Sequence, residues 1–162
     1  MSRPAMLFAA AVAAGAGLSP ASAAACPDAS TWGLLRFQAT GAQLFDPRYA
    51  EVSAGGGGWL GDCRTRVANA RGTLSGYFPR RPAVSLRLTG LDDYELEFRT
   101  DSPCDTLLLI NSGSGIWYYN DDATAEGDAA VRIVNPTDGI WDIWIGTFRS
   151  ERCDASLVVD TF

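Results

Sequence analysis

The densest group of residues that could do chemistry is an acidic stretch in the second half of the chain. Hard oxygen ligands of the kind that calcium prefers gather there, at Asn120, Asp121, Asp122, Glu126 and Asp128. Asn and Asp also build tight turns, because their side chains hydrogen-bond to nearby backbone groups. The Asp-x-Asp-x-Asp-Gly spacing of an EF-hand is absent. The stretch therefore predicts either a solvated turn or a calcium site of modest affinity.

The chain contains no His and no Lys, so all 13 basic residues are Arg. This excludes His-dependent triads and dyads, His-ligated zinc, Schiff bases and the Walker lysine. A carboxylate pair across a cleft could still hydrolyse glycosides, but Asp121 and Asp122 are neighbours that would diverge on a strand. The Gly run at 55–58 lacks the Lys-Ser/Thr of a phosphate loop and indicates a turn. The sequence predicts a protein that is not an enzyme.

Aromatic residues form a second candidate site. Strict alternation places Trp117 and Tyr119 on one strand face and Tyr118 on the other, and it places Trp144 opposite Trp141. One face of each strand in a sandwich is core. We therefore expect Tyr118 and Trp144 to be exposed and to contact a ligand, while the other aromatic residues pack inside.

The first 25 residues have the features of a secretory signal peptide. Arg3 precedes an apolar run at 5–18 that is too short to span a bilayer comfortably. Small residues follow, with cleavage expected after Ala25 or Ala23. A lipoprotein signal with a lipidated Cys26 is the alternative. The sequence predicts an exported protein, periplasmic or secreted.

The four cysteines all follow this leader, at Cys26, Cys63, Cys104 and Cys153. An even number in an exported chain argues for two disulfides formed in an oxidising compartment. No Cys-x-x-Cys spacing indicates a redox or zinc site. Three pairings are possible, and we expect Cys26–Cys63 with Cys104–Cys153, because each pair then stays within one half of the chain.

Charge differs between the two halves of the chain. Residues 26–90 carry eight Arg against four acidic residues, a net charge of +4, whereas residues 91–162 carry four Arg against fifteen, a net charge of −11. Acidic turns could simply keep a β-protein soluble, or they could attract a cation or a basic partner. The acidity argues against a nucleic-acid partner, whose phosphates would be repelled.

Short strands separated by turns account for most of the chain, and no segment after the leader predicts a helix or a transmembrane span. Strands are expected at 34–39, 49–54, 59–67, 84–88, 94–99, 107–110, 116–120, 131–134, 140–148 and 155–159. The alternating segments at 84–88 and 94–99 indicate half-buried strands, and the continuous apolar run at 107–110 is typical of a central strand. The spacing predicts a sandwich or a barrel.

Four motifs occur in order in the second half of the chain. They are Asp105-Thr-Leu-Leu-Leu-Ile, Gly113-Ser-Gly115, Asn120-Asp121-Asp122 and Gly139-Ile-Trp141-Asp-Ile-Trp-Ile-Gly146. Residues 72–162 resemble the bacterial pre-peptidase C-terminal (PPC) domain. The resemblance implies an all-β, antiparallel, jelly-roll-like β-sandwich. We expect residues 26–71 to be an N-terminal β segment of the same domain. The resemblance also implies substrate or calcium binding beside secreted peptidases, and it adds Asp105 to the candidate calcium ligands. Residues 26–71 are too few to form a peptidase domain, so we expect none before the module.

These observations predict an exported, non-catalytic binding or accessory module that calcium could stabilise. Its expected partner is an extracellular or envelope protein or a polysaccharide. A small structural protein of the envelope is the alternative. A secreted peptidase-associated protein or a hydrolase is a third interpretation, which the lack of His and Lys disfavours.

Overall fold

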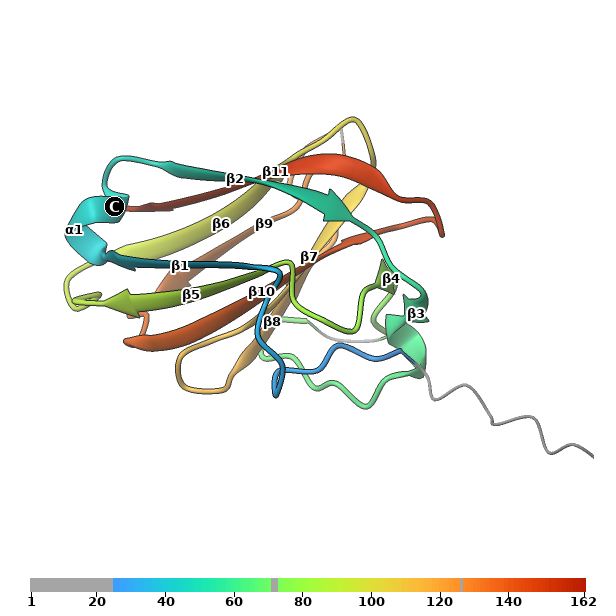
Figure 1. The fold of residues 1–162 in the computed structure, drawn as a ribbon, viewed down its shortest axis with the longest axis horizontal. Helices are drawn as coiled ribbons and strands as arrows, with labels where there is room; N and C mark the ends of the chain where they lie inside the picture. Colours follow the sequence, from blue (N-terminus) through green and yellow to red (C-terminus); the bar gives the residue numbers. More distant parts are fainter. Residues whose placement is uncertain (1–24, 71–72, 126) are drawn as a thin grey trace, which may run out of the picture.

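Two facing β-sheets form the body of the protein (Figure 1). The computed structural model describes residues 25–70, 73–125 and 127–162. The predicted signal peptide lies outside these residues except for Ala25. In the described part of the chain no helix is long and apolar enough to cross a membrane.

The elements follow one another as short strands with little helix. In chain order they are β1 (Leu35–Thr40), α1 (Gly41–Leu44), β2 (Arg48–Ala54), β3 (Gly58–Trp59), a 3₁₀ turn (Leu60–Asp62), β4 (Tyr77–Phe78), β5 (Val84–Thr89), β6 (Glu95–Asp101), β7 (Thr106–Asn111), β8 (Trp117–Asn120), β9 (Ala130–Val134), β10 (Gly139–Thr147) and β11 (Cys153–Thr161).

The larger sheet has the order β1-β5-β10-β7-β8, with β4 and β3 attached at the end of β10, and the smaller sheet has the order β2-β11-β6-β9. Neighbours run antiparallel except β1, which runs parallel to β5. Most connections cross from one sheet to the other, as in a jelly roll. The predicted all-β sandwich is confirmed. The strands β1 and β2, which precede position 72, belong to the same two sheets as the strands that follow it.

The main core lies between the sheets and follows the predicted alternation. Trp141, Ile143 and Ile145 of β10 face Phe98 of β6 and Leu157 of β11, and all five are at most 1% exposed. The rings of Trp141 and Phe98 lie 5.7 Å apart. The alternation in the sequence therefore predicted correctly which of these side chains share the buried face of the strand.

A second, smaller core covers the outer face of the larger sheet. Residues 57–70 and 73–78, here called the segment 57–78, cross this face and bury Leu60 and Phe78 against Leu107, Leu109 and Trp144. Strand β7 is consequently buried on both faces, which explains why its sequence is a continuous apolar run rather than an alternating one.

Two expected features differ in the structure. The strand predicted at 59–67 is only the two-residue β3, because the chain turns into a 3₁₀ turn at Leu60 and then runs irregularly over the sheet. The short helix α1 was not predicted. It begins at a capping box in which the Thr40 hydroxyl accepts from the Gln43 N–H and the Gln43 side chain accepts from the Thr40 N–H.

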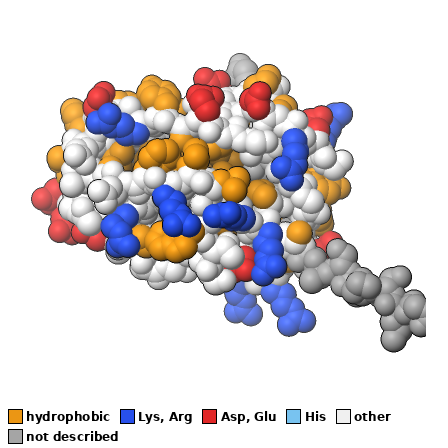
Figure 2. All heavy atoms as spheres, viewed as in Figure 1, with side chains coloured by type: hydrophobic (Ala, Val, Ile, Leu, Met, Phe, Trp, Pro, Cys, Tyr) orange, Lys and Arg blue, Asp and Glu red, His pale blue; other side chains and the backbone are white. Residues whose placement is uncertain are grey.

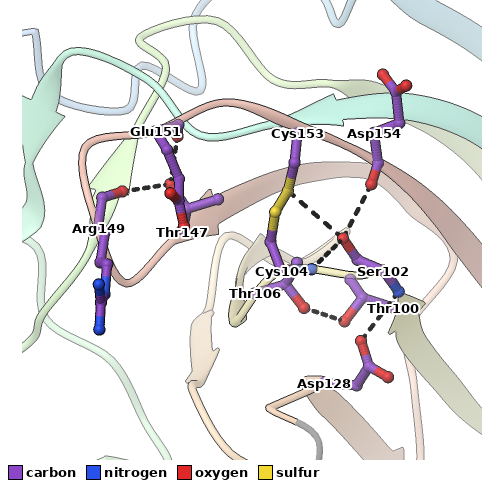
Figure 3. Close-up of a disulfide and its surroundings, with 10 residues drawn as sticks. All are labelled: Thr100, Ser102, Cys104, Thr106, Asp128, Thr147, Arg149, Glu151, Cys153 and Asp154. Atoms are coloured by element: carbon purple, nitrogen blue, oxygen red, sulfur yellow. Dashed lines mark hydrogen bonds between the residues drawn. A yellow bond between two sulfur atoms is a disulfide. The ribbon is translucent and has the colours of Figure 1, made fainter.

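Both expected disulfides, Cys26–Cys63 and Cys104–Cys153, are present. Cys104 precedes β7 and Cys153 begins β11, so this bond joins the two sheets (Figure 3). The Ser102 hydroxyl beside it accepts from the Cys104 N–H at 3.2 Å and donates to the Asp154 carbonyl at 2.9 Å. Two disulfides are typical of proteins that fold in an oxidising, exported environment.

Candidate functional site

Three of the six predicted calcium ligands accept hydrogen bonds with their side chains. A carboxylate oxygen of Asp121 accepts from the Tyr119 hydroxyl at 3.3 Å. The Asn120 side-chain oxygen accepts from the Ala130 N–H at 3.0 Å and joins β8 to β9. A carboxylate oxygen of Asp128 accepts from the Ser102 N–H at 3.1 Å and supports the loop beside the Cys104–Cys153 bond (Figure 3). Glu126 lies outside the described residues. These contacts give Asn120 and Asp128 structural roles, in which each side chain ties its end of the loop to the backbone of another segment.

Asp105, Asp121 and Asp122 lie within electrostatic reach of one another. Burial raises the pKa of Asp105, the nearby Asp122 and Asp121 carboxylates raise it further, and Arg149 opposes them. The acidic loop closes over Asp105, since a Cβ atom at Gly127 would be only 3.3 Å from the Asp105 Cα. Among the described residues, no group of three or more acidic, His or Cys side chains is close enough to hold a metal ion.

We expect Asp105→Asn to be more stable than the parent at pH 7, because it removes a charge that the nearby carboxylates repel. The gain should be at most about 0.5 kcal/mol, since the side chain is exposed and solvent screens the repulsion. Folding raises the pKa of Asp105, so the folded protein binds that proton more tightly than the unfolded chain does. The ionised carboxylate therefore destabilises the fold above the raised pKa, and the penalty disappears below the unfolded-state pKa. Urea unfolding should show the gain at pH 7 and almost none near pH 3.

A separate melting experiment tests whether the acidic loop binds calcium. A cation bound by the folded loop alone would raise its stability, by about 2.7 kcal/mol at a hundredfold excess over the dissociation constant. Melting is compared in chelator and in millimolar calcium for the parent and for Asp121→Ala combined with Asp122→Ala. Equal melting temperatures of the parent in both solutions would show that the loop is only a turn. A rise that the double variant retains would place the site elsewhere.

The expectation that Trp144 is exposed is wrong. Its side chain is 0% exposed because the segment 57–78 covers the outer face of the larger sheet. Its indole N–H donates to the Arg80 carbonyl at 3.1 Å. Tyr118 is half-buried and packs against the core between the sheets. The two residues lie on opposite faces of the larger sheet and do not form a common binding surface.

An apolar groove, which the sequence did not predict, lies at the open edge of the sandwich. A cavity of about 300 Å³ lies between β1 and β2. Its floor is made of core residues, Val84 and Leu86 of β5 and Leu157 and Val159 of β11. Phe37 of β1 and Tyr49 of β2 stand at the rim, 49% and 67% exposed. Figure 2 shows hydrophobic side chains gathered between these strands.

The comparisons do not identify the chain. No protein-family model matches it, and no curated protein matches it. Membership of the PPC family therefore stays a prediction.

The two strands beside the groove are sheet edges. Within the part of the chain that the structure describes, strand β1 pairs only with β5 and strand β2 only with β11. The Leu35 N–H donates to the Ala83 carbonyl at 3.0 Å. Because the backbone N–H and C=O groups of successive strand residues point to opposite edges, those of Arg36 and Gln38 point away from β5. No described residue bonds to these two N–H groups. Such an edge is a template for pairing with another strand.

Among the described residues, the charged residues that line the groove and the two hollows beside β1 are all arginines. Arg48 is the one charged residue that lines the groove, and Arg87 lines the adjoining hollow next to Thr40 and Gln43. A third hollow, further along β1, is lined by Trp32 with Arg36, Arg80 and Arg81. Within the described residues, Arg48 and Arg87 form no ion pair. Basic side chains border the hydrophobic band in Figure 2. The groove is thus apolar inside and positive at its border.

Proposed function

We propose that this protein is an exported, non-catalytic binding module of the cell envelope or the medium, and that its ligand site is the groove between β1 and β2. The ligand is an extended segment of another exported protein, with alternating apolar side chains and some carboxylates. The observation that carries the proposal is the apolar cavity between two unpaired strand edges.

The edges favour a peptide over a lipid. An extended peptide could bond to the outward backbone groups of Arg36 and Gln38, as in β-strand addition, whereas an acyl chain could not. Its apolar side chains would then pack against Phe37 and Tyr49 at the rim of the groove, which are 49% and 67% exposed. Covering these groups removes apolar surface from water, which is the main favourable contribution to such association.

The arginines favour an acidic ligand. Arg48 lines the groove and Arg87 the hollow beside it, with no carboxylate among the residues that line either of them. A carboxylate-bearing segment would therefore meet charges of opposite sign. Complementary charges of this kind speed association and fix the register of the bound strand.

A labelled heptapeptide of alternating Val and Asp or Thr residues is the probe for this site. We expect Phe37→Ser and Arg48→Glu each to weaken its binding at least tenfold, equivalent to about 1.4 kcal/mol. The first variant removes an apolar contact and the second reverses the charge at the border. Fluorescence anisotropy measures the affinity, which should also fall as salt rises.

Two variants control for general effects of hydrophobicity and charge. Val134→Ser removes an exposed apolar side chain from β9, at the other edge of the smaller sheet. Arg66→Glu makes the same charge reversal in the segment 57–78. Both should bind like the parent. If dodecanoate binds and the peptide does not, the groove takes a lipid, and if neither binds, the role as a structural envelope protein is favoured.

A further inference from the structure

A row of polar side chains crosses the outer face of the larger sheet, on the side that the groove does not use. Ser85 of β5, Asp142 of β10 and Asn111 of β7 are direct register partners. Residues opposite one another on neighbouring strands share a face and have Cβ atoms about 4.5–5.5 Å apart. The three side chains therefore lie next to one another in one line.

Hydrogen bonds hold one end of this row and leave the other end open. The Ser85 hydroxyl accepts from the Gly33 N–H at 2.7 Å and donates to one carboxylate oxygen of Asp142. The second oxygen of Asp142 and the side-chain amide of Asn111 bond to no described residue. No fully enclosed side-chain polar atom among the described residues lacks a partner. These groups therefore face accessible space.

That space is a pocket of about 460 Å³ above Asp142. The segment 29–32, which ends at Trp32, forms one wall, and the turn at 112–115 forms the other. Asp142 is the single charged residue among those that line it, although its side chain is only 6% exposed.

The surroundings of Asp142 give its carboxylate little compensation. Burial raises its pKa, and the Ser85 hydrogen bond lowers it in part. Arg36, the register partner of Ser85, is the next charged residue along the row. It lies two strands from Asp142, about 10 Å by ordinary strand spacing, and its guanidinium rests on the Trp32 ring, 5.0 Å from the centroid. A buried carboxylate without an ionic partner favours binding of a cation.

We propose that this pocket binds a small organic cation, an ammonium or guanidinium group, through the free oxygens of Asp142 and Asn111. N–H donors of such a group match these two acceptors. The flat ring of Trp32 provides a wall on which a cationic group can rest, as that of Arg36 already does. A divalent metal fits less well, because the pocket offers one carboxylate and calcium takes six to eight oxygen ligands.

Titration of the isotope-labelled protein with methylguanidinium and with methylammonium, followed by NMR, tests this site. We expect saturable shifts at the amides of Ser85, Asn111 and Asp142. Asp142→Asn should weaken the binding at least tenfold, while its side-chain oxygen still accepts from Ser85. Asp101→Asn makes the same charge change at an exposed position of the smaller sheet and should leave the affinity unchanged. Thermal melting of each variant verifies that it is folded.

Three outcomes would overturn the proposal. The first is the absence of saturable shifts at the pocket with either probe. In that case the role of Asp142 would be to hold the segment 29–33 in place through its hydrogen bond with Ser85. The second is undiminished binding by Asp142→Asn. The third is a response of the same residues to calcium chloride that competes with both organic cations, which would indicate a metal site. None of these outcomes depends on whether the groove between β1 and β2 binds a peptide.

Discussion

Replacing Trp144 by Ala should lower the free energy of unfolding by about 3–5 kcal/mol, the range for removing a buried Trp side chain. The side chain is fully buried, and its ring lies 5.1 Å from that of Trp117. The shorter side chain would leave a cavity between the larger sheet and the segment 57–78. It would also remove the indole hydrogen bond to the Arg80 carbonyl, which would keep the Asp28 N–H as a donor.

Trp32→Ala is the matched control for this loss. Trp32 is 45% exposed and has the Arg36 guanidinium on its ring, so its removal opens no core cavity. We expect a loss below about 1 kcal/mol in urea unfolding. Equal effects of the two substitutions would contradict the burial of Trp144 under a second core.

Replacing Cys104 and Cys153 together by Ser should reduce stability by about 4 kcal/mol in the chain-entropy account of disulfides. The bond joins residues 49 positions apart in the sequence, and it connects the lead into β7 with the start of β11 in the facing sheet. Without this disulfide the unfolded chain regains the conformational entropy that the closed loop had removed, and the folded state becomes less stable in comparison. For a domain of this size the melting temperature should fall by roughly 8–16 °C.

The Cys26→Ser and Cys63→Ser pair provides the comparison. This disulfide joins residues 37 positions apart, so the entropy term is of similar size. Cys63, however, belongs to the segment 57–78 and packs against the second core on the outer face of the larger sheet. Loss of this disulfide should therefore loosen that layer first. We expect faster amide hydrogen exchange in the segment 57–78 for Cys26→Ser with Cys63→Ser. For Cys104→Ser with Cys153→Ser, we expect faster exchange at the ends of β7 and β11 that the disulfide joins. A loss below 1 kcal/mol for Cys104→Ser with Cys153→Ser would contradict the linking role of that bond.

Local patterns in the sequence were sufficient to predict most of the fold. Alternation in β5, β6 and β10 identified the strands and the residues that share a face, since side chains of a strand point to opposite sides in turn. Turn residues marked most of the boundaries. The even number of cysteines and their positions in the two halves predicted both disulfides. These features depend on near neighbours in the chain and are therefore visible without a structure.

The sequence alone determined an all-β protein with two disulfides, but only the tertiary structure decided what covers each face of its sheets. The segment 57–78 has no periodic pattern that predicts its position, so the burial of Trp144 could not be inferred from alternation. The groove between β1 and β2 exists because neither edge strand gains a second partner. The row of Ser85, Asp142 and Asn111 depends on the pairing of strands distant in sequence. Alternation shows which residues share a face, whereas long-range packing decides whether that face meets a core, a ligand or water.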